Sequence, residues 1–462
     1  MSGMLVGFSV CNYRSFQDAQ NISMLASKIA RHKFHITTVG ARKLLKSALI
    51  FGANASGKSN FIKAVAFSRD IILKGLDEVD IVKEYFRIDG NMYSQPGIFQ
   101  YQIIINGQEY SYGLAISYEK KTILAEWLVK IGKNGEEQYV FNREIDEMGV
   151  CHVETEMTYE NPEENARMKV YLEDFGEEIS ALYTKKSILS NIATKVNDKS
   201  NLFRDIVLVY EWLKNIVIIF PTSKYRKLND VTTDKDVREF FGNLLSFFDT
   251  GVVGVENQEE KMDFDKVFQD MPVEEAEKIK VDISNNIDNE PIVLRINKKI
   301  YILRRGEKGN IIYNKMLLNH GNPEELFEYL DESDGTRRLL DLSPILFQNN
   351  KYSVVFIDEI DRSFHTSLTK RFLQKYYEIF ANDACQIILT THDINLLDLD
   401  LLRQDEIWFV ERRENHSSEL YSLSRYKERF DKRIDKEYLL GRYGAIPIFD
   451  ENLNISEVAD EE

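Results

Sequence analysis

The sequence predicts an α/β fold: a mixed core sheet that carries a phosphate-binding loop, an antiparallel β-lobe beside it, and a helical insertion. Residues 52–59, GANASGKS, have the Gly-x4-Gly-Lys-Ser spacing of a phosphate-binding loop and stand between an apolar run and a helical pattern. Residues 98–132 are rich in β-formers, with a turn signal at Asn106-Gly107, as in antiparallel strands. Residues 353–361, SVVFIDEID, are typical of a strand that is buried on both faces and ends in carboxylates.

The remaining elements follow in chain order. A first strand is expected at 5–10, and a second at 48–52 runs directly into the loop. Apolar side chains at helical spacing predict that a helix begins directly after the loop and extends over 59–75. After the β-rich lobe, residues 155–285 become charged and helical in pattern. Further strands are expected at 85–89, 98–117, 122–132, 291–306, 310–318 and 385–390.

This order divides the chain into four parts. The N-terminal half of the nucleotide head, with the β-lobe, is expected at 1–150, and a mainly helical insertion at 151–290. The C-terminal half of the head is expected at 291–447, followed by an acidic tail at 448–462.

Composition excludes several classes of protein. With 462 residues, 43% of them hydrophobic, the chain can form two or three buried cores. Cys11, Cys151 and Cys385 lie far apart without a CxxC pair, which excludes a disulfide framework and favours a reducing, cytoplasmic compartment. The N-terminus lacks signal-peptide features, and the most apolar stretch, 206–220, is too short to span a membrane.

The charge balance is strongly acidic. A formal net charge of −16 opposes nucleic-acid binding through a global basic footprint. Arg and Lys outnumber acids in residues 424–444, which makes this segment the best candidate for a local basic patch. The favoured interpretation, however, is a mixed-charge helix whose charges pair with one another on a solvated face.

The loop at 52–59 has a mechanical reason for each residue type. Its backbone N–H groups and the start of the next helix cradle phosphates, Lys58 reaches the β- and γ-phosphates, and Ser59 can bind Mg²⁺. A chance match in a chain of this size has a probability of roughly 1 to 2%. The nucleotide-binding residues expected here are Gly52, Asn54, Ser56, Gly57, Lys58, Ser59 and Asn60.

The strand at 353–361 is a Walker B pattern. A carboxylate at the end of such a strand can hold Mg²⁺, usually through water, and the next can polarise the attacking water. Asp358 is therefore assigned to the metal and Glu359 to catalysis as general base. A buried strand followed by an acidic turn would look the same in isolation.

Residues 385–393, CQIILTTHD, form another apolar strand that ends in Thr-Thr-His. A lone histidine at a strand end is more often structural. One strand after Walker B, however, an imidazole can contact the γ-phosphate, and we assign His392 as a catalytic switch residue.

Residues 331–342, DESDGTRRLLDL, open an apparent helix with a turn of small residues. Ser333 as a helix N-cap explains the pattern adequately. Ser333, Gly335 and Thr336 together with a helix N-terminus also make a γ-phosphate binder.

The order of NYRSF, GANASGKSN, SDGTRRLL, VVFIDEID, TTHD and GRYGAIP resembles the ABC-type, SMC- and OLD-like ATPases of bacterial defence loci, and most of all the RloA-like AAA-family ATPases, with the AriA ATPase of the PARIS system as a cousin. The resemblance covers about 1–130 and 320–447. It implies an ABC/SMC-like P-loop head with ATP and Mg²⁺ as cofactors, Arg14 near the nucleotide and Asp361 in a dimer-crossing loop. The signature turn at 333–336 would act on the nucleotide of the other subunit. The Q-loop glutamine of such proteins has no clear counterpart among Gln95, Gln100 and Gln102.

The function expected from these residues is that of an ATP-driven switch. Two copies would dimerise head to head around ATP, and hydrolysis would release them. The segment 393–462 is too short for the nuclease domain of OLD proteins, so a separately encoded effector, a nuclease by this reading, is expected, with a nucleic-acid or phage-derived trigger and no membrane. A RecF-like or SMC-like DNA-repair ATPase is the alternative, and a transporter subunit is disfavoured by the absent LSGGQ-like sequence.

Overall fold

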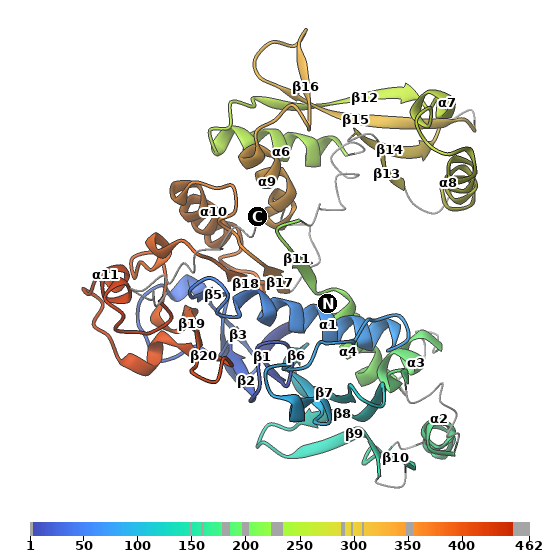
Figure 1. Ribbon diagram of the computed structural model, residues 1–462, viewed down its shortest axis with the longest axis vertical. Helices are drawn as coiled ribbons and strands as arrows, with labels where there is room; N and C mark the ends of the chain where they lie inside the picture. Colours follow the sequence, from blue (N-terminus) through green and yellow to red (C-terminus); the bar gives the residue numbers. More distant parts are fainter. Residues whose placement is uncertain are drawn as a thin grey trace, which may run out of the picture. The chain divides into compact units, whose positions relative to one another are not determined.

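The structure of the chain is a computed structural model (Figure 1). It divides into two compact units, each described by itself: unit 1 comprises 1–218, 351–360 and 381–462, and unit 2 comprises 219–350 and 361–380. No helix in the described part is long and apolar enough to cross a membrane. The structure describes residues 3–146, 149–158, 161–177, 185–195, 203–222, 234–287, 292–296, 299–306, 309–347 and 354–446. The expected acidic tail at 448–462 lies outside these residues.

The core sheet of unit 1 has the strand order β11-β17-β18-β5-β19-β20. Strands β17, β18, β5 and β19 are parallel, and β20 returns antiparallel to β19. Every residue of β5, β17 and β18 is buried, which explains their continuous apolar runs. The bounds are β5 Ser47–Phe51, β11 Val217–Ile219, β17 Val354–Ile357, β18 Gln386–Thr390, β19 Ile407–Arg412 and β20 Ser418–Ser422.

The β-lobe is a sheet with the order β10-β9-β8-β7-β6-β1-β2, and all its pairs are antiparallel. Asn106 (φ 51°) and Gly107 (φ 84°) form the tight turn between β6 and β7, as expected from the sequence. The bounds are β1 Gly3–Cys11, β2 Gln20–Ser23, β6 Gly97–Ile105, β7 Gln108–Ser117, β8 Thr122–Ile131, β9 Glu137–Ile145 and β10 Cys151–Glu154. A separate two-stranded sheet pairs β3 Ile36–Val39 with β4 Arg42–Leu45.

The expected strand at 85–89 is wrong. These residues form turns and irregular chain. The Phe86 N–H donates to the Asn12 side chain (3.1 Å), and the Arg14 N–H donates to the Glu84 carbonyl (2.7 Å). The segment therefore finds its hydrogen bonds in the turn after β1 and not in a sheet, which local β propensity does not reveal.

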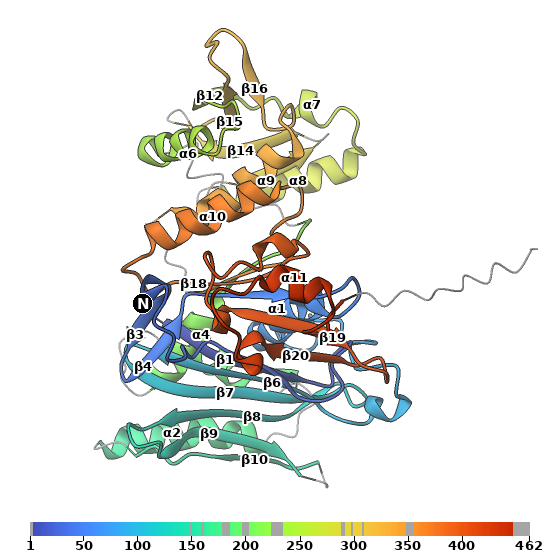
Figure 2. The same ribbon diagram turned by 90° about the vertical axis from the view of Figure 1, so that its left-hand side faces the viewer.

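Helix α1, Lys58–Lys74, lies between the core sheet and the β-lobe (Figure 2). Its Phe61 packs against Phe8 of β1, with ring centroids 5.5 Å apart. Its buried Ser68 hydroxyl bonds to the Tyr101 hydroxyl of β6 at 2.7 Å. Burial on both sides fixes the direction of the helix and so the placement of the loop before it.

Residues 185–218 are joined to the β-lobe by a buried carboxylate. Glu126 of β8 accepts hydrogen bonds from the N–H groups of Ile188 (2.8 Å) and Leu189 (3.1 Å) and from the Ser187 hydroxyl (2.7 Å). Arg143 lies 3.7 Å from the same carboxylate. Of residues 151–290, expected as one insertion, those up to 218 belong to unit 1 and those from 219 to unit 2. The helices on the unit 1 side are α2 Pro162–Glu177, α3 Ile188–Lys195 and α4 Arg204–Lys214.

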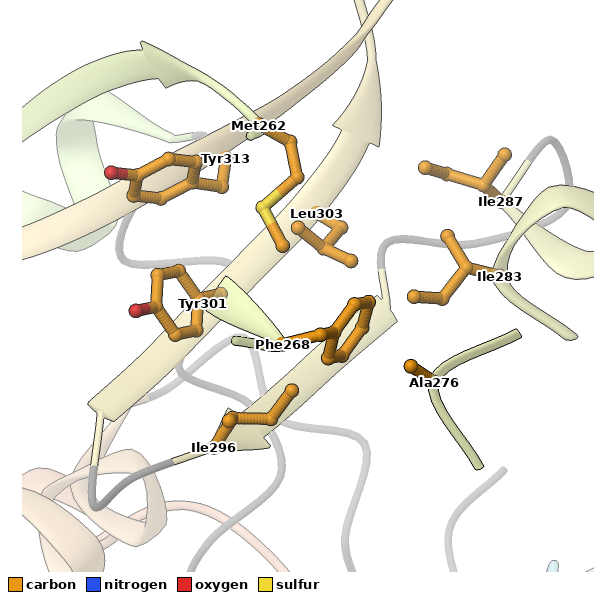
Figure 3. Close-up of a cluster of buried hydrophobic side chains, with 9 residues drawn as sticks. All are labelled: Met262, Phe268, Ala276, Ile283, Ile287, Ile296, Tyr301, Leu303 and Tyr313. Carbon is orange, nitrogen blue, oxygen red and sulfur yellow. The ribbon is translucent and has the colours of Figure 1, made fainter. Parts of the chain in front are cut away.

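Unit 2 contains a further antiparallel sheet, with the order β12-β15-β14-β13 and β16 paired to β15. Its hydrophobic core gathers Phe268, Leu303 and Tyr313 with side chains of α8, as Figure 3 shows. The strands expected at 291–306 and 310–318 are present, whereas β12 interrupts the expected helical stretch. The strands are β12 Gly254–Lys261, β13 Ile292–Ile296, β14 Lys299–Arg305, β15 Ile311–Asn319 and β16 Leu326–Glu328. The helices are α6 Lys235–Phe247, α7 Phe264–Val267, α8 Val273–Asn286, α9 Asp334–Leu342 and α10 Thr366–Ile379.

Candidate nucleotide-binding site

The phosphate loop leaves β5 at Phe51 and enters α1 at Lys58, the strand–loop–helix order that the sequence predicts. Two of its glycines are required by close neighbours. A Cβ at Gly52 would collide with the Val410 carbonyl, and one at Gly57 would collide with the Ser418 hydroxyl. Gly57 also has φ 114° and, as N-cap of α1, provides no side-chain hydrogen bond to the helix. The first N–H groups of α1 are therefore directed at a loop without a side-chain cap, which is the arrangement that binds phosphate.

The other loop residues fit the same ligand. Ser56 is buried, and its hydroxyl has no hydrogen-bond partner within the described residues. Asn54 is exposed, and Ser59 is half-buried at the second position of α1. Asn60 donates from its side chain to the Ser15 hydroxyl (2.9 Å). An orphaned hydroxyl, a glycine cradle and an uncapped helix start together suit the phosphates of a nucleotide.

Lys58 is 4% exposed and lies at the centre of the site. Its Nζ donates to the carbonyls of Gly52 (2.8 Å) and Ala53 (2.9 Å) and lies 3.3 Å from His392 Nδ1. The loop thus holds a nearly buried ammonium group beside its own helix N-terminus, and both features favour an anion.

The two carboxylates after β17 have different surroundings. Asp358 is buried and accepts a hydrogen bond from the Thr390 hydroxyl at 2.6 Å. The Thr390 oxygen in turn accepts the N–H of Glu359 at 2.8 Å, and Glu359 has the unusual φ of 50°. Glu359 is half-exposed, with its carboxylate 4.0 Å from His392 Nε2. Asp358 is thus held rigidly while Glu359 is turned toward the histidine.

Thr390 lies within the TTHD motif, but the sequence analysis assigns it no role. It lies at the end of β18, adjacent to β17 in the sheet, and one hydroxyl orders both acidic residues. The available signal was the rule that a buried hydroxyl at a strand end needs a partner. Only the strand order shows that the partner is Asp358.

Segments more than 300 residues apart in the chain thus form one centre. His392 lies within reach of both Lys58 (3.3 Å) and Glu359 (4.0 Å). The described residues contain no cluster of three or more His, Cys, Asp and Glu side chains that could hold a metal.

A cavity of about 530 Å³ lies beside the loop. Arg14 is part of its wall and forms a two-bond ion pair with Glu84 (2.5 and 2.8 Å). Arg14, Ala55, Lys83 and His416 all have positive φ angles, and such strain gathers at functional sites. The lining residues are Arg14, Ser15, Ala55, Asn60, Lys83, Glu84, Phe86, Arg87, Ile88, Arg412 and His416.

The signature turn belongs to unit 2. Ser333 is the N-cap of α9: its hydroxyl accepts the N–H of Thr336 (3.1 Å) and bonds to the Thr336 hydroxyl (2.9 Å). Gly335 lies close to the Ser363 carbonyl, which is 3.1 Å from the position a Cβ would take. Ser333 therefore caps α9, as one of the two interpretations of the sequence expected. Asp361 is also in unit 2.

The basic segment 424–444 is largely neutralised by its own acids. Arg433 pairs with Asp435 (2.6 Å), Lys432 with Glu428 (3.1 Å), and Arg442 with Glu428 (3.1 Å). Only a short part of it, α11 Ile434–Leu439, is helical. The mixed-charge interpretation therefore fits this segment better than a nucleic-acid patch, although the pairs connect turns as well as a helix.

Comparison with known proteins gives one family match. Residues 47–148 and 185–398 match the family described as "AAA domain, putative AbiEii toxin, Type IV TA system". This match covers more than half of the chain and includes the loop, both carboxylates and the histidine. No curated protein matches the sequence.

The fold is also similar to solved structures of SMC heads. One is a Smc head bound to the C-winged helix domain of ScpA, with TM-score 0.42 and 13% identity over 92% of this chain and 100% of that one. Another is the SMC head domain from Thermotoga maritima, with TM-score 0.36 and 12% identity over 91% and 98%. A third, derived from Pyrococcus furiosus, is a Smc head with an extended coiled coil bound to the C-terminal domain of ScpA, with TM-score 0.38 and 12% identity over 96% and 99%.

Proposed function

We propose that this chain, which belongs to the AAA-domain family that it matches over residues 47–148 and 185–398, is an ATP-binding and hydrolysing switch. Its place would be a bacterial anti-phage defence system of the OLD-like, RloA-like and AriA-related kind. The observation that carries the proposal is the single centre formed by Lys58, His392 and Glu359, with His392 3.3 Å from the first and 4.0 Å from the second.

The residues divide the chemistry of hydrolysis among them. The loop N–H groups and Lys58 would hold the triphosphate, and the Lys58 ammonium would turn from the loop carbonyls to the phosphates. Ser59 and Asp358 would hold Mg²⁺, which when bound neutralises the charge that develops on the phosphates. Glu359 would accept a proton from the attacking water as general base, and His392 would contact the γ-phosphate.

Dimerisation is the second part of the proposal. Ser333, Gly335 and Thr336 at the start of α9 would complete the nucleotide site of a second copy, so that ATP favours the dimer and hydrolysis releases it. The two interpretations of this turn are compatible, because Ser333 can cap its helix and still present Gly335 and the neighbouring N–H groups to an anion.

The output of the switch would be control of a separately encoded effector, a nuclease in the version we favour, in response to nucleic acid or a phage-derived trigger. The family description names a toxin of a type IV toxin–antitoxin system, which supports a two-component arrangement for this chain. The free cysteines Cys11, Cys151 and Cys385 are compatible with a cytoplasmic protein.

The test is a comparison of wild type with Glu359→Gln and with Glu378→Gln, which changes an exposed acidic residue of α10 that has no role in the proposed site. General-base catalysis contributes about 10² to 10⁴ in rate, so Glu359→Gln should lower kcat by that factor while ATP binding is kept. The variant should also accumulate as an ATP-bound dimer in size-exclusion chromatography with Mg²⁺-ATP, and a purified operon neighbour should bind one nucleotide state better than the other. Turnover equal to wild type in Glu359→Gln contradicts the base assignment. Hydrolysis that is strongly stimulated by DNA would instead favour the repair-ATPase alternative.

A further inference from the structure

The hairpin of β19 and β20 extends along the phosphate loop. Strand β5 pairs with β19 only as far as Phe51, opposite Phe409, and then leaves the sheet as the loop. Strand β19 continues to Arg412, and the chain returns at Ser418. The hairpin therefore flanks the loop at both ends: the Val410 carbonyl lies against Gly52, and Ser418 lies against Gly57.

Ser418 connects the hairpin to the loop. It is 2% exposed, and its hydroxyl donates to the Ser56 carbonyl at 2.5 Å. Its N–H donates to the Ser15 carbonyl at 2.7 Å, so the same residue also fixes the turn that carries Arg14. Ser418→Ala would leave the buried Ser56 carbonyl without its hydroxyl donor.

Arg412 is on the same face of the hairpin as Ser418. The two residues are direct cross-strand partners in the β19–β20 register, and such partners project to the same side. Arg412 lines the cavity beside the loop together with His416, whose Nδ1 accepts a hydrogen bond from Arg412 Nη2 at 2.7 Å. Within the described residues, no carboxylate lies in ion-pair distance of Arg412. The next residue, Arg413, is paired with Glu419 (3.2 Å) and Asp18 (3.1 Å).

We propose that the β19–β20 hairpin is a further nucleotide-binding segment, in which Ser418 positions the phosphate loop and Arg412 supplies positive charge to the cavity beside that loop, where it would attract a nucleoside triphosphate bound by the loop. The hairpin tip lies beyond the residues that match the family, 47–148 and 185–398, and outside the sequence motifs. The inference rests on the proposed ATP site and adds a binding contribution from the C-terminal part of unit 1.

The Arg412 part is tested with two neighbouring arginines. Binding of Mg²⁺-ATP is measured by isothermal titration calorimetry at 50 and 300 mM NaCl for wild type, Arg412→Ala and Arg413→Ala. Loss of an unneutralised charge should raise Kd about tenfold at low salt and weaken the salt dependence in Arg412→Ala. Arg413→Ala removes the same side chain from the opposite face, where its partners are acids, and should bind ATP like wild type.

The Ser418 part is tested with two neighbouring buried serines. Ser418→Ala should raise the Kd and KM for ATP about three- to tenfold, because loss of one hydrogen bond loosens the loop, while kcat changes little. Ser418→Thr keeps the hydroxyl and should recover binding. Ser417→Ala is the control, since the Ser417 hydroxyl donates within the turn to Asn415 (2.7 Å) and not to the loop. Thermal unfolding without ATP shows whether each variant is folded.

The outcomes separate this inference from the proposed function. If wild type binds no ATP, the proposed function fails. If wild type binds ATP and both Arg412→Ala and Ser418→Ala match their controls, the hairpin inference is overturned while the proposed function stands. If Ser418→Ala does not fold, the Arg412 and Arg413 pair decides by itself.

Discussion

Helices α1 and α9 begin with similar residue types but differ in how their first N–H groups are capped. Both begin with a serine, glycine and polar residue cluster, GKS at 57–59 and SDGT at 333–336. The α1 N-cap, Gly57, provides no side-chain hydrogen bond to its helix. The α9 N-cap, Ser333, accepts the Thr336 N–H at 3.1 Å. The start of α1 thus has no side-chain cap for its first N–H groups, whereas the start of α9 satisfies one of its N–H groups internally.

The difference shows which observations distinguish a candidate phosphate site from an ordinary capped helix start. At α1, neighbouring groups make glycine necessary at positions 52 and 57. The same loop contains Lys58 and the Ser56 hydroxyl, which has no hydrogen-bond partner in the part of the chain that the structure describes. At α9 the same residue types are accounted for by capping. The assignment of α1 therefore rests on several independent observations, whereas that of α9 rests on a proposed second copy.

The largest effect on ATP binding is expected from Lys58→Ala at the start of α1. Lys58→Ala removes a nearly buried ammonium group from the phosphate site, and we expect Kd for Mg²⁺-ATP to rise by about a hundredfold or more. Arg337→Ala, which removes a half-buried cation paired with Asp334 from the start of α9, is the matched control and should bind ATP normally in a dilute monomer. Both are measured by titration calorimetry. Equal affinity for the two variants would remove the distinction between the helix starts.

The α9 side is sharpened by substitutions that separate capping from phosphate binding. Ser333→Ala loses the cap and should destabilise the helix by about 1 kcal/mol, which corresponds to a lower unfolding midpoint by about 2 °C. Ser333→Asp keeps a good N-cap but places a negative charge where the γ-phosphate of a second copy would lie. We expect Ser333→Asp to be as stable as wild type and to bind ATP, with ATP-dependent dimerisation and hydrolysis strongly reduced.

Ser333→Ala and Ser333→Asp separate the two roles of this position, because the first removes the cap and the second keeps it while adding a negative charge. If Ser333→Asp dimerises and hydrolyses ATP like wild type, α9 is only a capped helix and the dimer proposal loses its signature residue. The readouts are the unfolding midpoint without ATP and the concentration dependence of turnover.

The sequence predicted the local parts of this site better than its assembly. The loop, the strand ending at Asp358 and the strand ending before His392 each follow from continuous apolar runs and motif spacing, because those signals are local. The parallel order of β17, β18 and β5, which places His392 within reach of Lys58 and Glu359, comes from pairing between distant strands. Thr390 and Ser418 could not be recognised for the same reason: their partners lie on other strands or in the loop.

The fold shows the same limit in two other places. The segment at 85–89 has the residues of a strand, but hydrogen bonds to Asn12 and the adjacent turn replace a sheet. The boundary near 218 was not visible in the helical pattern of 155–285. On the unit 1 side, Glu126, a buried carboxylate on β8, binds the start of α3, and a sequence pattern cannot show which helix a distant carboxylate caps.

The smallest expected effects come from replacing Ser56, before α1, and Ser333, the N-cap of α9, by alanine. Ser56→Ala removes a buried hydroxyl that has no hydrogen-bond partner among the described residues, so the ATP-free protein should lose no stability. If that hydroxyl is used by the nucleotide, Kd for Mg²⁺-ATP should rise about three- to tenfold, the value of one hydrogen bond. Ser333→Ala should behave in the opposite way, with a lower unfolding midpoint and unchanged ATP affinity in a dilute monomer. The same substitution at two helix starts thus separates a hydroxyl kept for a ligand from one used by the fold, and a stability loss in Ser56→Ala equal to that in Ser333→Ala would show that both serve the fold.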